Sequence, residues 1–343
     1  MQTGSLTYMA TTAPGLGSIA ISEISAKLPG AWIQNQMRGR ILFNTDAPWG
    51  QIQELKCVDN LYLHIAWLKI GPHRNHLGDL TDDFESISLL DLPFLRRARP
   101  GSKVIINASR SGKHTFSRFE AAKAAMKGLA KAYKFTPGTV DDHEFNFRLD
   151  IVDQDALFSL KLTDSTFRFR GQRDFSKGAL RPPIAHALIW LSNPKPEDTF
   201  LDPFCGSGTI VAERSLYTAQ SIIGSDLSKN IVAIAKANVP DNVEIVQMDA
   251  CSLTDIADES INSIVSNPPW GKQVAQGEDI GKLYMQFFQE MNRVLTKGGS
   301  AVLLTDRKSA IQAAAESTNL QCQELYTISL HGLLPVVYQI WKT

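Results

Sequence analysis

The sequence of 343 residues contains only four cysteines, and none of them forms the C-x-x-C pair that is typical of zinc or redox sites. The scattered cysteines are Cys57, Cys205, Cys251 and Cys322. We therefore expect reduced thiols and no metal centre. No apolar run reaches the ~18 residues of a membrane span, and the first residues lack the basic start and apolar core of a secretory signal. We expect a cytoplasmic chain with no membrane partner.

The sequence also has no internal repeat and no low-complexity tract. Its hydrophobic fraction of 43% is ordinary for a globular protein. A chain of this length is too long for one typical domain, so we expect two or three. We expect a monomer.

The net charge is zero, but the charges are unevenly distributed. Residues 91–134 contain eleven Lys or Arg and two Asp or Glu, which gives a local charge of +9. Residues 182–343 contain eleven Lys or Arg and seventeen Asp or Glu, which gives −6. A basic middle beside an acidic C-terminal part indicates that the middle meets a polyanion. The alternative is a solvated charged face.

The first 70 residues alternate between apolar runs and turn signals. A short amphipathic helix is predicted at 19–28, and strands are predicted at 31–36, 39–43 and 61–70. These elements predict a small α+β unit. Residues 79–91 are acidic and then apolar, which is consistent with a helix or a connector.

A second unit is predicted from about residue 96. Strands are expected at 103–108, 145–152 and 156–162, with a helix over 117–134. Ser117 followed by Glu120 forms a capping box at the start of this helix. Its lysines recur every three or four residues, which places them on one face. Residues 166–170 alternate Phe with Arg, and Pro182-Pro183 indicates a boundary.

The third unit alternates strands and helices. Strands are predicted at 199–203, 221–226, 243–248, 261–266, 300–304, 324–329 and 336–341, and helices at 208–218, 229–238, 282–295 and 310–317. This alternation predicts a parallel sheet covered by helices on both faces. Ligands of such sheets bind beyond the carboxyl ends of the strands.

A glycine turn lies between the first strand and the first helix of this unit. It begins at Asp202 and contains Gly206 and Gly208, which let the backbone approach a ligand closely. Asp226 and Asp249 end the next two strands, where a carboxylate can bind ribose hydroxyls. The turn lacks the P-loop lysine and the dinucleotide glycine pattern. Asp202 would repel a pyrophosphate but suits a cation, so S-adenosylmethionine fits better than NAD. A purely structural turn is the alternative.

Residues 267–270, Asn-Pro-Pro-Trp, follow the fourth strand. Prolines stiffen the chain, so the Asn267 side-chain oxygen and the Pro268 carbonyl can accept both hydrogens of one exocyclic amine. Trp270 offers a face on which a base can stack. A simple proline-rich turn is the alternative.

Together, these two motifs resemble those of the class I methyltransferases that modify exocyclic amines of nucleobases, over at least residues 182–341. The order, with the glycine turn first, differs from that of many DNA enzymes. Residues 13–17 and 167–183 resemble the ferredoxin-like and THUMP arrangement of tRNA-binding enzymes. The resemblance implies a Rossmann-like α/β sheet at the C-terminus, preceded by a ferredoxin-like α+β domain and a THUMP α/β domain. The implied limits are 1–70 for the ferredoxin-like domain, 71–170 for THUMP, 171–182 for a linker and 183–343 for the methyltransferase domain.

The resemblance also assigns roles to residues. Asn267, Pro268 and Trp270 would present the target base. The cofactor S-adenosylmethionine, released as S-adenosylhomocysteine, would contact Asp202, Phe204, Gly206, Gly208, Thr209, Asp226, Leu227, Asp249, Ala250 and Asn267. Separately, the positive charge of the middle of the chain and of the junction predicts RNA contacts at Arg96, Arg97, Arg99, Lys103, Arg110, Lys113, Arg118, Lys127, Arg168, Arg170, Arg173 and Lys177.

The function implied is methylation of guanosine N2 in tRNA, and the nearest resemblance is to the enzymes that act at position 6 of the acceptor stem. Two alternatives stay open. In the first, the enzyme methylates a ribosomal RNA guanine or another nucleobase amine. In the second, the protein binds RNA without catalysis.

Overall fold

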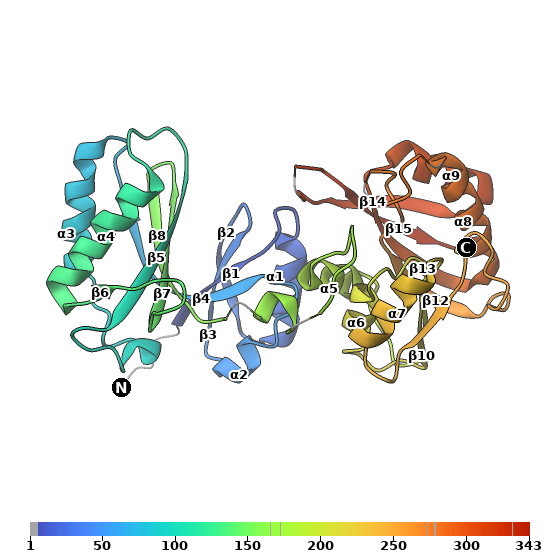
Figure 1. The fold of residues 1–343 in the computed structure, drawn as a ribbon, viewed down its shortest axis with the longest axis horizontal. Helices are drawn as coiled ribbons and strands as arrows, with labels where there is room; N and C mark the ends of the chain where they lie inside the picture. Colours follow the sequence, from blue (N-terminus) through green and yellow to red (C-terminus); the bar gives the residue numbers. More distant parts are fainter. Residues whose placement is uncertain (1–5, 165, 172, 273, 278, 331) are drawn as a thin grey trace.

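The chain forms two sheets joined by a buried helix. The computed structural model describes residues 6–164, 166–171, 173–272, 274–277, 279–330 and 332–343. Figure 1 shows an elongated molecule of three bodies in a row, in which the first part of the chain lies in the middle. The eight-stranded sheet has the order β2-β3-β1-β4-β8-β7-β5-β6, and the seven-stranded sheet has the order β11-β10-β9-β12-β13-β15-β14.

The middle body is a βαββαβ unit. Its elements are β1 (Leu6–Thr11), α1 (Gly17–Lys27), β2 (Trp32–Met37), β3 (Arg40–Thr45), α2 (Trp49–Ile52) and β4 (Asn60–Lys69). All its neighbouring strands are antiparallel, in the order β2-β3-β1-β4. This is the ferredoxin-like arrangement, so the predicted α+β fold is confirmed. The sequence patterns do not predict β1 and α2.

The second part of the chain continues the same sheet, because β4 pairs with β8. Its elements are η1 (Arg74–His76), α3 (Leu77–Ser86), η2 (Pro93–Leu95), β5 (Lys103–Ser111), α4 (Arg118–Tyr133), β6 (Thr136–Pro137), β7 (Phe145–Val152), β8 (Asp155–Lys161) and η3 (Phe167–Phe169). The capping box of Ser117 and Glu120 at α4 is confirmed. Helix α4 packs on α3 at Gly128, where an added Cβ would lie 2.4 Å from the Thr81 carbonyl oxygen. The closeness of the two helices therefore requires glycine.

The face of this sheet opposite the helices is also partly closed. Arg40 of β3 donates two hydrogen bonds to Asp150 of β7, at 2.9 and 2.7 Å, although three strands lie between them in the sheet. The contact requires a strongly curled sheet. A small apolar cluster fills the inside of the curl, formed by Met9, Leu42, Tyr62 and Leu157. The first two parts of the chain are thus packed together on both faces of one sheet.

The C-terminal sheet is mixed. Its elements are α5 (Pro182–Leu191), β9 (Thr199–Asp202), α6 (Thr209–Arg214), β10 (Ser221–Asp226), α7 (Lys229–Asn238), β11 (Glu244–Gln247), β12 (Ile261–Ser266), α8 (Ile280–Val294), β13 (Leu295–Thr305), α9 (Lys308–Thr318), β14 (Gln321–Thr327) and β15 (Val336–Trp341). Strand β15 is antiparallel to both of its neighbours. The prediction of a wholly parallel sheet is therefore wrong at β15, because a short connection returns the chain directly beside β14.

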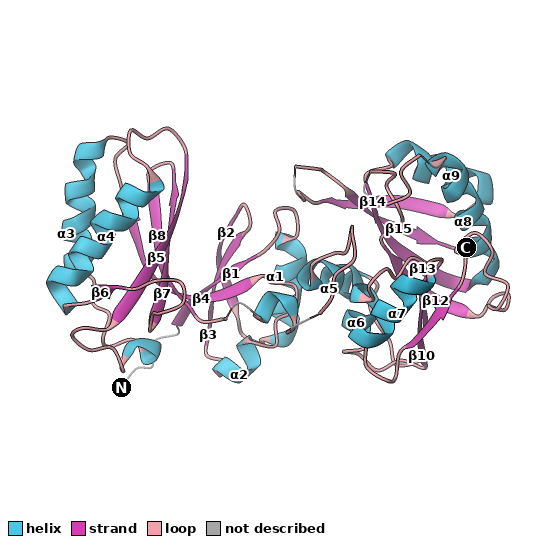
Figure 2. Ribbon diagram, viewed as in Figure 1, coloured by secondary structure: helices cyan, strands magenta, loops and turns pink. Residues whose placement is uncertain are grey.

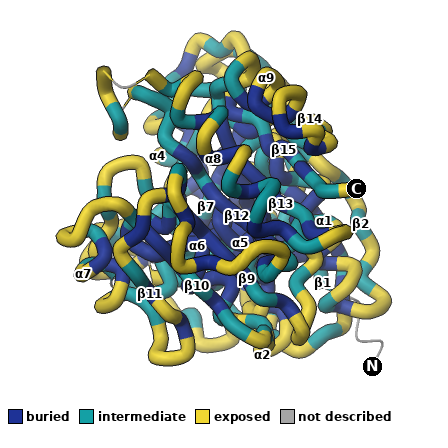
Figure 3. The backbone as a smooth tube through the Cα atoms, turned by 90° about the vertical axis from the view of Figure 1, so that its right-hand side faces the viewer, coloured by how far each residue is buried: buried dark blue, intermediate teal, exposed yellow. Residues whose placement is uncertain are grey.

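Strand residues of this sheet alternate between two cores. Phe200 and Val302 belong to the core that includes α5, α6 and α7, whereas Leu201 and Leu303 belong to the core under α8 and α9. Figure 2 shows these helices on opposite sides of the strands. Figure 3 shows the central strands as buried and the surrounding loops as exposed. This period of two confirms a sheet covered on both faces.

Helix α5 joins the two sheets. Its first two residues are Pro182 and Pro183, which favour the first turn of a helix. The sequence analysis predicts a domain boundary at this pair. In the structure the pair begins a helix that packs on α1, α6 and β13. The helix is apolar all round, as expected when both sides are covered. The domain limits 1–70, 71–170, 171–182 and 183–343 remain predictions. Among the described helices, none has the length and apolar character needed to cross a membrane.

Candidate active site

Four polar residues meet at one edge of the C-terminal sheet. Asp202 ends β9 and Asp226 ends β10, Asp249 follows β11, and Asn267 follows β12. These strands are neighbours, in the order β11-β10-β9-β12, and all run in the same direction. Their carboxyl ends therefore open on one edge, which is where ligands of such sheets bind. The structure brings together the residues that the sequence predicts as one site.

The glycine turn leads from β9 into α6. Gly206 and Gly208 have φ angles of +53° and +86°, which residues with a Cβ rarely adopt. An added Cβ at Gly208 would lie 2.9 Å from a methyl group of Val239. The turn is therefore tightly packed on its inner side. Phe204 packs edge-to-face on Phe287, with ring centroids 5.0 Å apart, and so anchors the turn on the core.

Asp202 is a fully buried carboxylate that is only half satisfied. The Ser266 hydroxyl donates to Asp202 Oδ1 at 2.6 Å, and the Phe204 backbone N–H donates to the same oxygen at 3.2 Å. Asp202 Oδ2 is buried and finds no donor within the described residues. Burial raises the pKa of Asp202 to about 7, although these two donors act against it. Since a buried polar atom without a partner is costly, Oδ2 indicates a place for a cationic donor from a ligand.

Asp226 and Asp249 are more accessible than Asp202. Each uses one oxygen to accept a backbone N–H two residues further along, at 2.9 Å from Ser228 and 2.8 Å from Cys251. These bonds hold the two carboxylates at the edge of the sheet. Leu227 is 67% exposed beside Asp226 and offers an apolar surface.

Two other predicted cofactor residues lie inside the fold. The side chains of Thr209 and Ala250 are buried. The Ala250 side chain packs in the core under α8 and α9. A contact between Ala250 and a ligand therefore has to come from its backbone.

The Asn-Pro-Pro-Trp loop leaves one side-chain acceptor unused. The Asn267 amide nitrogen donates to the Gly178 carbonyl oxygen at 3.3 Å, which defines the other side of the amide as the acceptor. That acceptor, Asn267 Oδ1, is buried and has no donor in the part of the chain that the structure describes. The Tyr284 hydroxyl donates to the Pro269 carbonyl at 3.4 Å, and Arg307 Nε donates to the Trp270 carbonyl at 2.5 Å. The loop is thus held from both sides while Asn267 Oδ1 stays available.

Trp270 is tied to the sheet. Its indole N–H donates to the Leu304 carbonyl oxygen at 3.2 Å, and its ring packs against the core. These contacts fix the orientation of the ring. Stacking of a base on its face stays a prediction.

The segment before α5 crosses the glycine turn. Asn238 links the two, because its amide nitrogen donates to the carbonyls of Asp174 and Ser207 at 2.7 and 2.9 Å. An added Cβ at Gly206 would lie 3.4 Å from the Ser176 hydroxyl oxygen. With the bond between Asn267 and Gly178, this segment touches both predicted motifs.

Sequence patterns do not predict five residues of this site. They are Ser266, Gly178, Asn238, Tyr284 and Arg307. Ser266 directly precedes Asn267, so its place at a strand end was the one available signal. The others come from distant parts of the chain, and only the tertiary fold brings them to the site.

Comparison with known proteins agrees with this geometry. Residues 170–335 match the family described as RMKL-like, methyltransferase domain. The matched segment runs from the residues before α5 to the turn before β15.

Relatives match nearly the whole chain. A tRNA (guanine(6)-N2)-methyltransferase of Thermus thermophilus is 28% identical over 97% of this chain and 98% of the relative. The tRNA (guanine(6)-N2)-methyltransferase of Methanocaldococcus jannaschii is 23% identical over 97% and 99%. The crystal structure of TrmN from Thermus thermophilus superposes with a TM-score of 0.83, at 25% identity, over 98% of this chain and 100% of that chain. The class I methyltransferase fold is thus confirmed, with the same arrangement along the chain.

A second polar cluster lies where the methyltransferase domain meets the ferredoxin-like unit. Glu23, Cys57 and His186 bring potential metal-ligand atoms within 4.8 Å of one another. However, Lys27 Nζ lies 2.7 Å from Glu23 Oε1, and backbone N–H groups of Lys56 and Cys57 donate to both Glu23 oxygens. An ammonium group beside the carboxylate disfavours a metal cation at the same place.

His186 completes this cluster from α5. Its Nδ1 lies 3.0 Å from Glu213 Oε2, and its Nε2 lies 2.9 Å from the Tyr217 hydroxyl. His186 Nε2 also lies 3.5 Å from Glu23 Oε1. Since Glu23 belongs to α1 and Glu213 to α6, the cluster links the methyltransferase domain to the ferredoxin-like unit.

Most of the predicted RNA contacts lie on the surface. Exposed side chains are Arg96, Arg97, Arg99, Lys103, Arg110, Lys113, Arg118, Lys127 and Lys177. Of these, Lys103 forms an ion pair with Asp142. Arg168 is half-buried and lies over the Phe169 ring, 4.6 Å from its centroid. These positions remain predictions as RNA contacts.

The position of Arg170 does not favour the predicted RNA contact. Only 11% of its side chain is exposed, and it donates to the carbonyls of Phe167 and Lys56 at 2.8 and 2.7 Å. Its Nε lies 3.4 Å from Glu213. Arg170 is therefore used inside the protein, at the junction with the methyltransferase domain. Arg173 is half-buried, and its Nη1 has no hydrogen-bond partner among the described residues, so its role as an RNA contact stays a prediction.

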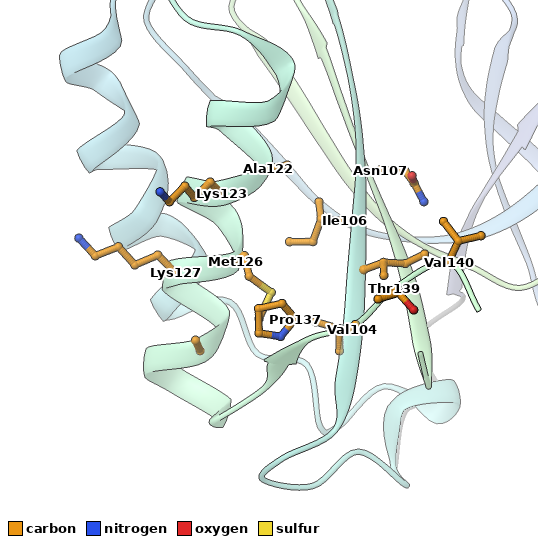
Figure 4. A pocket seen from close by; sticks show the side chains of 13 residues that line it. Val104, Ile106, Asn107, Ala122, Lys123, Met126, Lys127, Pro137, Thr139 and Val140 are labelled. Carbon is orange, nitrogen blue, oxygen red and sulfur yellow. The ribbon is translucent and has the colours of Figure 1, made fainter. Parts of the chain in front are cut away.

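A groove of about 770 Å³ lies between α4 and β5 in the basic unit. In Figure 4, Met126 of α4 faces Pro137 across it, with Val104 and Ile106 on β5. Lys123 and Lys127 extend away from the floor of the groove. The groove thus has an apolar floor beside a basic helix face.

Proposed function

We propose that this protein transfers a methyl group from S-adenosylmethionine to the N2 amine of a guanosine in tRNA, at position 6 of the acceptor stem. One observation carries the proposal. Two buried acceptors, Asp202 Oδ2 and Asn267 Oδ1, lack donors among the described residues and lie at the carboxyl ends of adjacent strands. One suits the ammonium group of a methionine moiety, and the other suits a planar amine. The two full-length relatives named above carry the same activity in their names.

The residues present fit the cofactor. Asp202 Oδ2 would accept from its ammonium group, and Gly206 and Gly208 leave room for its methionine part. Asp226 and Asp249 would accept from ribose and adenine, in the order in which their strands lie. When bound, S-adenosylmethionine supplies an electrophilic methyl group on a sulfonium. The proposal needs no metal.

The loop residues would then orient the nucleophile. The guanine N2 lone pair is delocalised into the ring, which makes the amine a poor nucleophile. Asn267 Oδ1 and the Pro268 carbonyl would each accept one N–H, so that the lone pair points toward the donor. Holding two reactants in line can contribute ~7–11 kcal/mol. The contacts of Asn267 with Gly178 and of Trp270 with Leu304 and Arg307 keep this arrangement rigid.

The basic unit would hold the RNA. Its exposed Lys and Arg side chains suit phosphates, which set the register of binding and not the sequence. A base in a stem has to leave the stack to reach the site, at a cost of a few kcal/mol. We also propose that the enzyme is a monomer and acts in the cytoplasm.

Incubation with unmodified tRNA and labelled S-adenosylmethionine tests the proposal. Mass spectrometry of the digested RNA should show N2-methylguanosine, and mapping should place it at nucleotide 6. Methylation of ribosomal RNA only, or of another base, would replace the proposed substrate. Binding of the donor without transfer to any RNA would contradict the proposed activity.

A further inference from the structure

The Asn-Pro-Pro-Trp loop cannot by itself select guanine. Its acceptors recognise an exocyclic amine, and adenine and cytosine also carry one. What distinguishes guanine is the carbonyl oxygen O6 on the same ring, where adenine has an amino group. A guanine-specific site therefore needs a hydrogen-bond donor beside the amine acceptors.

Arg307 lies at the right edge of the sheet for this role. It follows β13 by two residues, and β13 is the parallel neighbour of β12, with Ser266 opposite Leu303. The carboxyl ends of both strands therefore open on the same side. Arg307 Nε donates to the carbonyl of Trp270, which belongs to the loop itself. An added Cβ at Gly271 would lie 3.3 Å from Arg307 Nη2, so the guanidinium runs along this part of the loop.

The Arg307 guanidinium is anchored through Nε, but its two terminal nitrogens have no acceptor among the described residues. The backbone N–H of Arg307 donates to the Thr305 hydroxyl at 3.1 Å, and the side-chain Nε lies 3.5 Å from Asp306 Oδ1. In contrast, neither Nη1 nor Nη2 donates a hydrogen bond to any residue that the structure describes. The side chain is 37% exposed. Arg307 thus presents two charged donors beside the loop that carries the amine acceptors.

The neighbouring cation is not available in the same way. Lys272 Nζ lies 2.5 Å from Asp306 Oδ2. Asp306 therefore holds Lys272 through one oxygen and lies near Arg307 through the other. A planar guanidinium with two unpaired nitrogens matches the O6 and N7 acceptors of guanine better than a paired ammonium group does.

We propose that Arg307 is a specificity-determining residue that donates hydrogen bonds to the O6 edge of the target guanine. The inference rests on the proposed function and deepens it. In adenine the same place holds an amino group, which would face the cationic guanidinium with no acceptor. Arg307 would therefore turn a general amine site into a guanine site.

The experiment compares two base analogues. Ligated tRNA carries either guanosine or 2,6-diaminopurine riboside at the methylated nucleotide, and the second base keeps the N2 amine but replaces O6 with an amino group. The ratio of kcat/KM for the two RNAs is measured for the wild-type protein and for Arg307→Ala. Differences in the cost of extruding the base cancel, because both proteins meet the same two RNAs.

Wild-type protein should prefer guanosine roughly 10- to 100-fold, and Arg307→Ala should lose most of this preference. Lys308→Ala removes a neighbouring exposed cation that pairs with Glu324, and it should leave the ratio unchanged. Arg307→Lys keeps the charge but loses the fork, and it should give an intermediate ratio. If Arg307→Ala turns over too slowly for its kcat/KM ratio to be measured, the ratio for Arg307→Lys takes its place.

Two failures are distinguishable. If both Arg307 variants slow the two RNAs equally, Arg307 only supports the loop and this inference is wrong, while the proposed function stands. If the wild-type protein methylates neither RNA although it binds the donor, the proposed function fails and the inference fails with it.

Discussion

Glu23 and Asp202 are both buried carboxylates, but their surroundings are opposite. Glu23 Oε1 accepts a hydrogen bond from Lys27, and both Glu23 oxygens accept from backbone N–H groups. Burial alone would raise the pKa of Glu23, but the hydrogen bond with His186 and the charge of Lys27 outweigh it and lower the pKa to about 2. Asp202 keeps one oxygen without a donor in the described chain, and burial raises its pKa to about 7.

The difference distinguishes a carboxylate with a structural role from one that we propose binds a ligand. The Glu23 cluster lies where three elements meet and satisfies its charge internally, so it serves to hold the methyltransferase domain on the ferredoxin-like unit. Asp202 lies at the carboxyl edge of a sheet and keeps one oxygen without a donor among the described residues, which is the arrangement that we propose for a ligand site. A related contrast applies to two arginines. Arg170 is 11% exposed and donates to carbonyls inside the protein, whereas neither Nη atom of Arg307 donates to a residue that the structure describes.

The largest expected effect is on stability. Glu23→Ala removes one partner of a buried ion pair and should lower the free energy of unfolding by about 3–5 kcal/mol, measured by urea denaturation. The matched control is Glu54→Ala, because Glu54 is 63% exposed and pairs with Lys56 at 3.3 Å. Its effect should stay within about 0.5 kcal/mol. Equal effects of the two variants would mean that the buried cluster does not hold the domains together.

A smaller effect on binding is expected at Asp202. Asp202→Asn removes the charge that would pair with the ammonium group and should weaken binding of S-adenosylmethionine by about 1.5–3 kcal/mol. Calorimetric titration measures the change in affinity. The free energy of unfolding should not fall at neutral pH, since a costly buried charge is lost. A large loss of stability with unchanged affinity would reverse the roles assigned to Asp202 and Glu23.

The two carboxylates also predict opposite pH dependences of stability. The native protein keeps the Asp202 proton up to pH about 7, whereas the unfolded chain loses it near pH 3.8, so Asp202 makes stability fall as pH rises between these values. Glu23 contributes stability that is present above pH 4.5 and is lost as pH falls toward about 2. Asp202→Asn should therefore flatten the decline between pH 4 and 7, as followed by thermal unfolding. An unchanged profile would contradict the raised pKa of Asp202.

The smallest expected effect is on tRNA binding by the exposed basic residues. Lys127→Ala should weaken tRNA binding modestly at all sequences and reduce the slope of log affinity against log salt by about one unit. Arg170→Ala should leave that slope unchanged and lower stability instead, because its guanidinium bonds within the protein. Fluorescence anisotropy at several salt concentrations distinguishes the two. A lower slope for Arg170→Ala would restore it as an RNA contact.

The sequence predicts those elements whose patterns are local. The limits of β7, β10, α7, β12 and β15 agree with the apolar alternation and the turn signals. Helix α5 is missed because it is apolar all round, so its pattern has no amphipathic period and its two prolines resemble a linker. The antiparallel direction of β15 is missed because strand direction depends on the fold and not on local pattern.

For the candidate site, too, only residues in local sequence patterns could be predicted. Asp202 and Asn267 are recognisable because their motifs are continuous in sequence. Ser266, Asn238 and Arg307 come from separate elements, and their roles depend on side-chain contacts that no spacing encodes. Arg170 was a plausible RNA contact by charge alone, but its burial depends on how α5 and α6 pack.

The most direct test of the account is single-turnover methyl transfer to tRNA by Asn267→Ala at saturating donor. Loss of the unpaired acceptor should slow transfer roughly 10²- to 10³-fold, as removal of one preorganised polar group does elsewhere, while the Kd for S-adenosylmethionine stays nearly constant. The control is Asn262→Ala at the opposite end of β12, where the side chain accepts from the Thr199 N–H. It should transfer at the wild-type rate per folded molecule. Normal transfer by Asn267→Ala would contradict the central claim that this buried oxygen holds the target amine.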